Sequence, residues 1–302
     1  MLENVLAVAN GKGGVGKTTI AANVAGQAAL SGWRVLVCDL DAQGDLGRDL
    51  GYVQAGRSDG GQALFDAVCR GQPLKPLTEV REGLDAIAGG EELDYLESVL
   101  DRKRLREDTQ RTPLEAALRE IAVDYDLVLL DCPPSLGELV REAFVTARFI
   151  LIPTTRDDGS TDGLVRIARM VASVRASDNP AIEVLGVVLF DFGAADSCMI
   201  RETRAVLQES LQGHVPVFDT VVRHNRKGSA EMRRLGLLAY EYERAMLASL
   251  ATDYFGAAKN FSRGAGGLAG DYEALSQQIL ARYAETLNDR ASRVGAYSEV
   301  RA

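Results

Sequence analysis

Short apolar runs alternate along this chain with longer segments in which apolar residues recur every three or four positions. Each short run indicates a strand, and each longer segment indicates an amphipathic helix. The expected strands lie at 4–9, 34–39, 84–88, 126–131, 148–152, 183–190 and 217–222. The expected helices lie at 17–31, 61–70, 91–107, 113–122, 136–147, 160–176, 198–212, 240–256 and 270–288. This alternation predicts an α/β fold with a doubly wound, mostly parallel sheet and helices on both faces.

Residues 1–302 are expected to form a single domain, because no stretch of the chain has the length and composition of an interdomain linker. The last helices are expected within 240–288, followed by a flexible tail at 289–302. Residues 256–270 are rich in glycine, alanine and serine, which indicates a flexible loop between the last two helices. No N-terminal DNA-reading domain is expected before the first strand.

A glycine-rich segment follows the first expected strand. Residues 11–19 read Gly-Lys-Gly-Gly-Val-Gly-Lys-Thr-Thr and fit the pattern G-x-x-x-x-G-K-[ST], with an additional lysine, Lys12, inside the loop. A strand, a loop and a helix in this order point backbone N–H groups and the positive helix end at an anion. The segment therefore predicts a site for nucleotide phosphates. The alternative is a glycine-rich turn that has no ligand.

Acidic residues stand at the ends of two expected strands. Asp39 and Asp41 close the strand at 34–39, and they face the same side if the segment is extended. Asp131 closes the apolar run at 126–131. Ligands of open α/β folds bind at the carboxyl ends of the strands, so these carboxylates are candidates to support Mg²⁺ beside a phosphate. An aspartate that merely caps a turn is the alternative for each position.

Composition restricts the classes of function. The net charge of −9 excludes a surface coated in positive charge, so any nucleic-acid contact must come from a local patch. No signal segment is expected before the first strand, and no apolar run approaches the length of a membrane span. Four well-separated cysteines are expected to be reduced and packed, and a metal site built from them or from the two histidines lacks the required spacing. These residues are Cys38, Cys69, Cys132, Cys198, His214 and His224.

The chain resembles the ParA family of partition ATPases, within the ParA/MinD group of P-loop NTPases that carry a deviant Walker A loop. The resemblance rests on K-G-G-V-G-K-T-T at 12–19, D-L-D-A-Q-G at 39–44, and the segments 125–135, 150–153 and 186–188. Ala42 replaces the proline of the family's D-x-D-P-Q-G motif, and the match beyond residue 190 is looser.

The resemblance implies a role for each residue of the nucleotide site. Lys17 would contact the β- and γ-phosphates, the Thr18 hydroxyl would bind Mg²⁺, and Thr19 would contact the α-phosphate. Lys12 is similar to the signature lysine that reaches the phosphates held by a second subunit. The backbone that would close around the anion belongs to Gly13, Gly14, Val15 and Gly16. The acidic residues are Asp41, which would position the attacking water, and Asp39 and Asp131, which would support Mg²⁺ through its water ligands.

The resemblance also implies a cellular role. The expected protein is a partition ATPase for plasmid, phage or chromosome segregation that uses ATP and Mg²⁺ and hydrolyses ATP slowly. ATP would join two copies into a homodimer that binds non-specific DNA, and a ParB-like centromere-binding partner would stimulate the hydrolysis that releases it. The expected location is the cytoplasm, at the nucleoid, without membrane contact.

A basic segment in the last third of the chain is the candidate DNA surface. Residues 223–229 read Arg-His-Asn-Arg-Lys-Gly-Ser, and Arg233 and Arg234 follow with only Glu231 opposing them. Family members bind DNA through arginines in this region, without reading sequence. The candidate DNA contacts are Arg201, Arg223, Arg226, Lys227 and Arg233. Arg223 replaces the usual proline of the family, and an ordinary solvated basic face is the alternative.

Two other functions remain open, and a third is disfavoured. A MinD-like positioning ATPase would need a C-terminal amphipathic helix for the membrane, whereas residues 285–302 mix both charges with small side chains. A metabolic P-loop enzyme would need a substrate pocket with its own catalytic residues, for which the sequence offers no candidate. A nitrogenase-like reductase would need paired cluster cysteines, which this sequence lacks.

Overall fold

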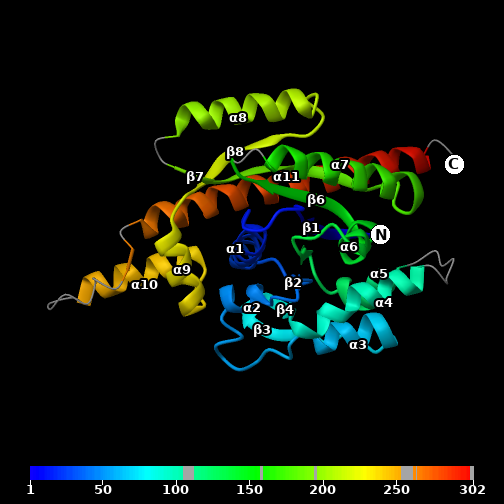
Figure 1. The fold of residues 1–302 in the computed structure, drawn as a ribbon, viewed down its shortest axis with the longest axis horizontal. Helices are drawn as coiled ribbons and strands as arrows, with labels where there is room; N and C mark the ends of the chain where they lie inside the picture. The colour runs from blue at the N-terminus through cyan, green and yellow to red at the C-terminus, as the bar shows by residue number, and fades with distance from the viewer. Residues whose placement is uncertain (105–111, 157–158, 194–195, 253–260, 263, 300–302) are drawn as a thin grey trace.

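Eight strands form one sheet in the order β3-β4-β2-β5-β1-β6-β7-β8 (Figure 1). The computed structural model describes residues 1–104, 112–156, 159–193, 196–252, 261–262 and 264–299. Every neighbouring pair of strands is parallel except β3 and β4, which are antiparallel. The strands are β1 Leu2–Val8, β2 Val35–Asp39, β3 Leu77–Arg81, β4 Leu84–Ile87, β5 Leu127–Asp131, β6 Ala147–Thr154, β7 Glu183–Phe192 and β8 Val217–Arg223. The predicted α/β fold is therefore confirmed.

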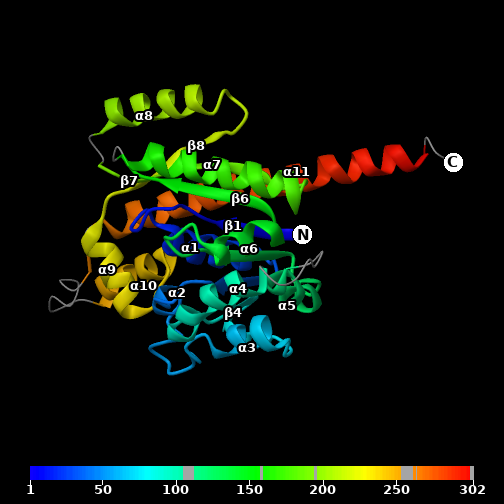
Figure 2. The same ribbon diagram turned by 45° about the vertical axis from the view of Figure 1, so that its right-hand side comes forward.

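Helices cover both faces of this sheet (Figures 1 and 2). The helices on one face are α3 Gln62–Arg70, α4 Leu96–Arg104, α5 Pro113–Ala122, α6 Glu138–Thr146, α7 Gly159–Ser177 and α8 Ser197–Ser210, with the 3₁₀ helix η1 Glu91–Tyr95 beside them. The helices on the other face are α1 Lys17–Leu30, α2 Asp45–Asp49, α9 Arg226–Leu235, α10 Ala239–Thr252 and α11 Ala265–Glu299. None of the helices described is both long and apolar enough to cross a membrane.

The central strands are apolar at consecutive positions because both of their faces are buried. In β5, Val128 and Leu130 pack into one core and Leu127 and Leu129 pack into the other. Successive side chains of a strand point to opposite faces, so a strand between two helical layers needs apolar residues on both sides. The strand order also reverses at β1, because the chain leaves β1 toward β2 on one side and returns to β6 on the other. Such a reversal opens a crevice at the carboxyl ends of the strands.

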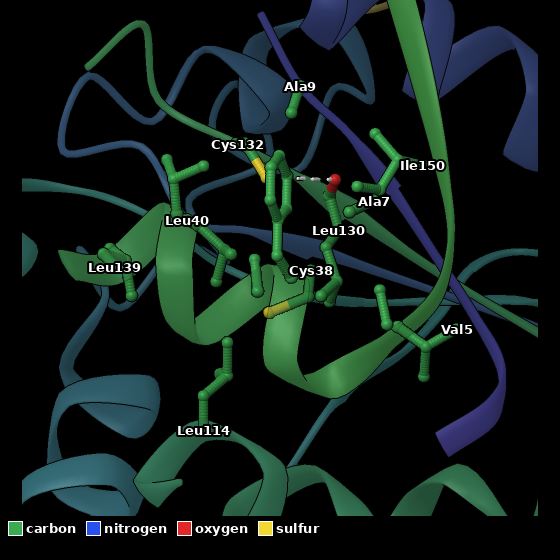
Figure 3. Close-up of a cluster of buried hydrophobic side chains, with 14 of the residues drawn as sticks. Val5, Ala7, Ala9, Cys38, Leu40, Leu114, Leu130, Cys132, Leu139 and Ile150 are labelled. Carbon is green, nitrogen blue, oxygen red and sulfur yellow. Dashed lines mark hydrogen bonds between the residues drawn. The ribbon is translucent and has the colours of Figure 1, made fainter. Parts of the chain in front are cut away.

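Two cysteines belong to the core beneath α6 (Figure 3). Cys38 and Cys132 are buried among aliphatic side chains, and burial raises the pKa of both thiols well above the ordinary value. All four cysteines are free thiols, as the sequence predicts. Cys198, however, is exposed on α8, so the expectation that every cysteine is packed is wrong for this residue.

Three elements were missed by the sequence analysis. Edge strand β3 has the sequence Leu-Thr-Glu-Val-Arg, which lacks the apolar run of the central strands because much of it faces solvent. Helix α2 has only five residues, too few for a visible periodicity. Helix α9 coincides with the basic segment, in which Gly228 and Met232 are the only fully buried positions of the helix. Too few apolar residues recur along this segment to predict a helix.

The C-terminal region corrects two expectations. Helix α11 begins at Ala265, so residues 265–270 form its first turns and are not part of a loop. A Cβ atom on Gly267 would lie 2.5 Å from Nη1 of Arg223, so glycine here lets α11 pass close to the end of β8. The helix then continues to Glu299, whereas the sequence analysis ended it at 288 and expected a flexible tail; no proline interrupts 289–299. Residues 256–260, 263 and 300–302 lie outside the described part of the chain.

A buried carboxyl group in α6 gives the first testable prediction. Burial raises the pKa of Glu142 to about 7, although its Oε2 accepts a 3.0 Å hydrogen bond from the Leu114 N–H. The folded state therefore binds the proton more tightly than the unfolded state, and this group makes the protein less stable as pH rises from about 4 to about 7. We expect Glu142→Gln to increase the free energy of unfolding at pH 8 by on the order of 1–2 kcal/mol, with little effect at pH 5.

Urea unfolding at both pH values measures this difference. Glu120→Gln on the exposed face of α5 is the matched control and should leave the free energy of unfolding within about 0.5 kcal/mol of wild type. A Glu142→Gln variant that is less stable than wild type at pH 8 would contradict this prediction and show that the carboxylate is needed in its charged form.

Candidate nucleotide site

The glycine-rich loop connects β1 to α1 at the point where the strand order reverses. Gly14 and Gly16 have φ angles of 74° and 84°, in the left-handed region that favours glycine. A Cβ atom on Gly16 would also lie 2.5 Å from the ring of Phe190, which packs against the loop from the end of β7. Both the backbone conformation and the close ring therefore require glycine at position 16.

Internal hydrogen bonds hold this loop in shape. The Lys12 N–H donates to Oδ1 of Asn10, and Nζ of Lys17 donates to the Lys12 carbonyl oxygen at 3.0 Å. Lys17 is almost fully buried, and burial lowers the pKa of its ammonium group while the nearby carboxylate of Asp131 opposes that shift. The loop is thus folded around the lysine that the sequence assigns to the phosphates.

Parallel pairing places two of the predicted acidic residues side by side. Asp39 is the register partner of Asp131 in the pair β2–β5, and both side chains are fully buried. Oδ1 of Asp39 accepts the N–H of Asp41 at 2.9 Å, and Oδ2 accepts the N–H of Leu46 at 3.3 Å. Burial raises the pKa of Asp39 well above its usual value, and the neighbouring charge of Asp131 adds to that effect. The Asp39 side chain therefore fixes the backbone of the loop that carries Asp41.

Asp131 is the residue whose surroundings fit a nearby cation. Both of its oxygens are buried and neither accepts a hydrogen bond of good geometry, although the Thr18 hydroxyl and the Lys17 ammonium lie close enough to favour its charged form. Burial nevertheless raises the pKa of Asp131 to about 7. A buried carboxylate without a full set of donors, next to a hydroxyl, is the hard-oxygen environment that Mg²⁺ prefers.

The described residues contain no group of three or more histidine, cysteine, aspartate or glutamate side chains arranged to hold a metal. A magnesium ion at this site would accordingly need oxygen ligands from Thr18, from water held by Asp39 and Asp131, and from the phosphates themselves.

A pocket of about 340 Å³ opens above these residues. It is lined by the glycine-rich loop, by the loop after β2 and by one residue of α9. The lining residues are Gly13, Gly14, Gly16, Lys17, Thr18, Thr19, Asp41, Gln43, Asp45, Pro134, Phe190 and Arg233. The structure therefore brings Asp41 together with the phosphate loop, as expected for a residue that would act on a bound phosphate.

A second hollow of about 280 Å³ adjoins the first and shares Gly14, Thr19 and Phe190 with it. Its other walls come from the β8–α9 junction, including Asn225, and from Tyr272 of α11. The Asn225 side chain caps α9 by accepting the Gly228 N–H at 2.9 Å. One continuous depression therefore runs from the acidic residues, over the glycine-rich loop, to α11.

The predicted DNA contacts are separated by the fold. Arg223 lies at the end of β8, and its guanidinium forms two hydrogen bonds with Asp271 of α11, at 2.6 and 2.7 Å. Arg226 and Lys227 are exposed in the first turn of α9, and Lys227 lies 3.9 Å from Glu231. Arg201 is exposed on α8, which lies beyond β8 and away from α9 in both views (Figures 1 and 2). Whether these residues bind DNA stays a prediction.

Arg233 occupies a place that the sequence analysis did not foresee. It was grouped with the candidate DNA contacts, but the structure places it in the wall of the nucleotide pocket. Its guanidinium contacts Asp45 and Asp49, two further acidic residues that the sequence analysis left out. These aspartates follow the D-L-D-A-Q-G motif, and this closeness in sequence was the only available signal.

Comparisons with known proteins identify the family and the fold of the chain. Residues 3–184 match a family model described as an AAA domain. The chain is 34% identical over 226 residues to the chromosome partitioning protein ParA of Caulobacter vibrioides, an alignment that covers 73% of this chain and 80% of that protein.

Solved structures share the fold over most of the chain. The pNOB8 ParA structure matches with a TM-score of 0.72 at 16% identity, over 94% of this chain and 99% of that one. A cobyrinic acid a,c-diamide synthase from Mycobacterium smegmatis, with bound ADP and magnesium, matches with a TM-score of 0.63 at 25% identity, over 83% of this chain and 96% of that one.

Proposed function

Because the chain belongs to the ParA family of partition ATPases, we propose that it is a nucleotide-switched ATPase that moves or positions DNA. The proposal rests on one observation above all: Lys17, Thr18 and Asp41 line a single pocket, with Asp39 and Asp131 side by side beneath it. The cofactors that fit are ATP and Mg²⁺, and the related synthase binds ADP with magnesium.

The residues of the pocket supply position and charge for phosphoryl transfer, which needs no covalent protein intermediate. The backbone N–H groups of the loop and Nζ of Lys17 would neutralise the phosphate oxygens. Thr18 would offer its hydroxyl to a magnesium ion, with Asp39 and Asp131 holding the surrounding water. A magnesium ion held there would neutralise part of the negative charge of the phosphates. Asp41 would orient the water that attacks the γ-phosphate, because it lines the same pocket as the loop and its backbone is fixed by Asp39.

ATP is proposed to join two copies of the chain. Lys12 lies in the glycine-rich loop, one residue before the lining glycine Gly13, and its backbone is fixed by Asn10 and Lys17. A long cationic side chain that starts next to the lining of the pocket would reach phosphates bound by a second copy. Anything that binds only the dimer stabilises it by mass action, so ATP would favour the dimer and hydrolysis would release it.

The ATP-bound dimer is proposed to hold DNA through phosphate contacts, and to be released when a ParB-like partner accelerates hydrolysis. This would place the protein at the nucleoid. Arg226 and Lys227 are the best-placed candidates, because both are exposed on α9 beside the nucleotide depression. Arg223 is less available, since Asp271 neutralises it through two hydrogen bonds.

The structural match to a synthase favours one alternative, a metabolic P-loop enzyme on the same fold. Such an enzyme would turn over a small acid in the presence of ATP and would ignore DNA. Binding of the ATP-bound protein to duplex DNA therefore distinguishes the two functions.

We expect Arg226→Glu combined with Lys227→Glu to weaken binding of ATP-bound protein to duplex DNA by at least about tenfold, equally for unrelated sequences. Phosphate contacts carry no base information, and each lost contact should reduce the slope of log K against log salt by about one. Fluorescence anisotropy with two duplexes of different sequence measures both quantities. Arg102→Glu with Lys75→Glu, the same charge change at exposed sites on α4 and before β3, is the control.

Two results would count against this reading. Equal weakening by the control pair would show that only net charge matters. Wild-type protein that ignores DNA with ATP at low salt would remove the segregation function and favour the metabolic alternative.

A further inference from the structure

Arg233 is held at the wall of the nucleotide pocket by two carboxylates from another element. Its Nε donates to Oδ1 of Asp49 at 2.6 Å, and its Nη1 donates to Oδ2 of Asp45 at 3.1 Å. Helix α9 supplies the arginine and α2 supplies both aspartates. The Arg233 side chain is 37% exposed, so part of the guanidinium remains open to the pocket.

The same carboxylate of Asp49 reaches the phosphate loop. Thr19 Oγ1 donates to Oδ2 of Asp49 at 3.0 Å, and Asp49 is 5% exposed. A chain of contacts therefore runs from the first turn of α1 through Asp49 to Arg233. The guanidinium is fixed close to a hydroxyl that lines the pocket.

The backbone around Arg233 is also fixed. Gln54 Nε2 donates to the Arg233 carbonyl oxygen at 2.8 Å and to the Arg48 carbonyl oxygen at 3.0 Å. A Cβ atom on Gly51 would lie 2.9 Å from the Gly236 carbonyl oxygen, so α9 ends in close contact with the segment after α2. Arg233 is thus presented to the pocket by a rigid support, which a binding residue needs.

Its two carboxylate partners differ in how much they depend on it. Asp49 is buried and would be left with an unpaired charge if Arg233 moved away. Asp45 is 31% exposed, and its Oδ1 already accepts a 2.8 Å hydrogen bond from Nη1 of Arg48. Arg233 can therefore release Asp45 at small cost while its Nε stays on Asp49.

We propose that Arg233 binds the phosphate chain of the nucleotide, with Nη1 transferring from Asp45 to a phosphate oxygen while Asp49 holds Nε. This rests on the proposed function of the pocket and adds a second cation, from the same subunit, to Lys17. Guanidinium groups form strong charge-assisted hydrogen bonds with phosphate, and Arg48 still pairs with Asp45 after the transfer. Arg233, which the sequence analysis named as a candidate DNA contact, would then bind ATP.

The test compares Arg233→Gln with Arg234→Gln, the next residue on α9, which is exposed. Isothermal titration calorimetry with ATP and Mg²⁺ measures the dissociation constant of each variant, and circular dichroism checks that each is folded. We expect Arg233→Gln to weaken ATP binding by about 10–100-fold, the effect of one strong charged hydrogen bond. Arg234→Gln should bind ATP within twofold of wild type.

A second comparison distinguishes phosphate binding by Arg233 from its structural role as the ion-pair partner of Asp49 on α2. In an Asp49→Asn background the buried charge is gone, and the amide oxygen can still accept the Thr19 hydroxyl. If Arg233 serves only to neutralise Asp49, then adding Arg233→Gln to Asp49→Asn will leave ATP affinity unchanged. If Arg233 binds phosphate, the double variant will bind ATP at least tenfold more weakly than Asp49→Asn. This comparison also applies if Arg233→Gln alone fails to fold.

Failure of the Arg233 proposal and failure of the proposed pocket function give different results. Equal ATP affinity of Asp49→Asn and the double variant would overturn the proposal and leave Arg233 a structural link between α9 and α2. If the wild-type protein does not bind ATP at all, the proposed function of the pocket fails, and that result is recognisable before any variant is compared.

Discussion

Asp41→Ala is expected to bind ATP with nearly wild-type affinity and to hydrolyse it at least about a hundredfold more slowly, the usual loss when one oriented polar group is removed from a reaction site. The reason is that Asp41 lines the same pocket as the phosphate loop but belongs to the separate segment after β2. Its backbone N–H is held by Asp39 and its Oδ1 accepts the Gln43 N–H at 3.0 Å, so the alanine variant loses only one local hydrogen bond.

A single-turnover assay with radiolabelled ATP measures the hydrolysis step directly. Asp94→Ala, an exposed aspartate on η1, is the matched control and should hydrolyse ATP as wild type does. The ATP-bound dimer of Asp41→Ala should also persist, because the step that ends it is blocked. A turnover rate equal to wild type would rule out a role for Asp41 with the attacking water.

Lys12→Ala is expected to bind ATP but to lose ATP-dependent dimerisation. The Lys12 backbone contributes its N–H and carbonyl to the loop, and an alanine preserves both contacts with Asn10 and Lys17. In the proposed dimer the variant also loses the contact of this side chain with the partner's phosphates, where a charge-assisted hydrogen bond contributes about 1.5–3 kcal/mol in each of the two symmetric contacts. The dimer dissociation constant should therefore rise by at least about a hundredfold.

Multi-angle light scattering with ATP, ADP or no nucleotide measures the mass of each variant. Lys17→Ala is the informative comparison, because it should lose nucleotide binding itself and remain monomeric under every condition. If Lys12→Ala forms dimers at the same concentration as wild type with ATP and Mg²⁺, Lys12 does not act across the subunit interface.

The residues close together in sequence were the ones that the sequence predicted well. The phosphate loop was identified from one short pattern, since its backbone contacts are made within residues 10–17. The position of Asp39 and Asp131 at the carboxyl edge of the sheet also followed from sequence, because the carboxyl ends of parallel strands meet at one edge. Their direct pairing between β2 and β5 was not predicted. The central strands were predicted because burial on both faces leaves apolar residues at every position.

The basic segment shows why the other contacts of the site could not be predicted from sequence. Counted along the sequence, it has a single opposing carboxylate, Glu231. In the fold, Asp271 of α11 neutralises Arg223, while Asp45 and Asp49 of α2 hold Arg233. These acids lie 48, 188 and 184 positions away in the chain. The charges counted along the segment therefore overestimate the positive charge that the folded surface presents. Only the packing of α9 on α2 shows that Arg233 belongs to the nucleotide pocket.

The rate of ATP hydrolysis, measured with Mg²⁺ alone, with non-specific duplex DNA and with anionic liposomes, tests the central claim most directly. A nucleotide-switched partition ATPase should hydrolyse ATP slowly, lose this activity on Lys17→Ala, and turn over faster with DNA at low salt but not with liposomes. Stimulation by liposomes without an effect of DNA would contradict the account and support a membrane-positioning ATPase, and the absence of any Lys17-dependent ATP hydrolysis would contradict it entirely.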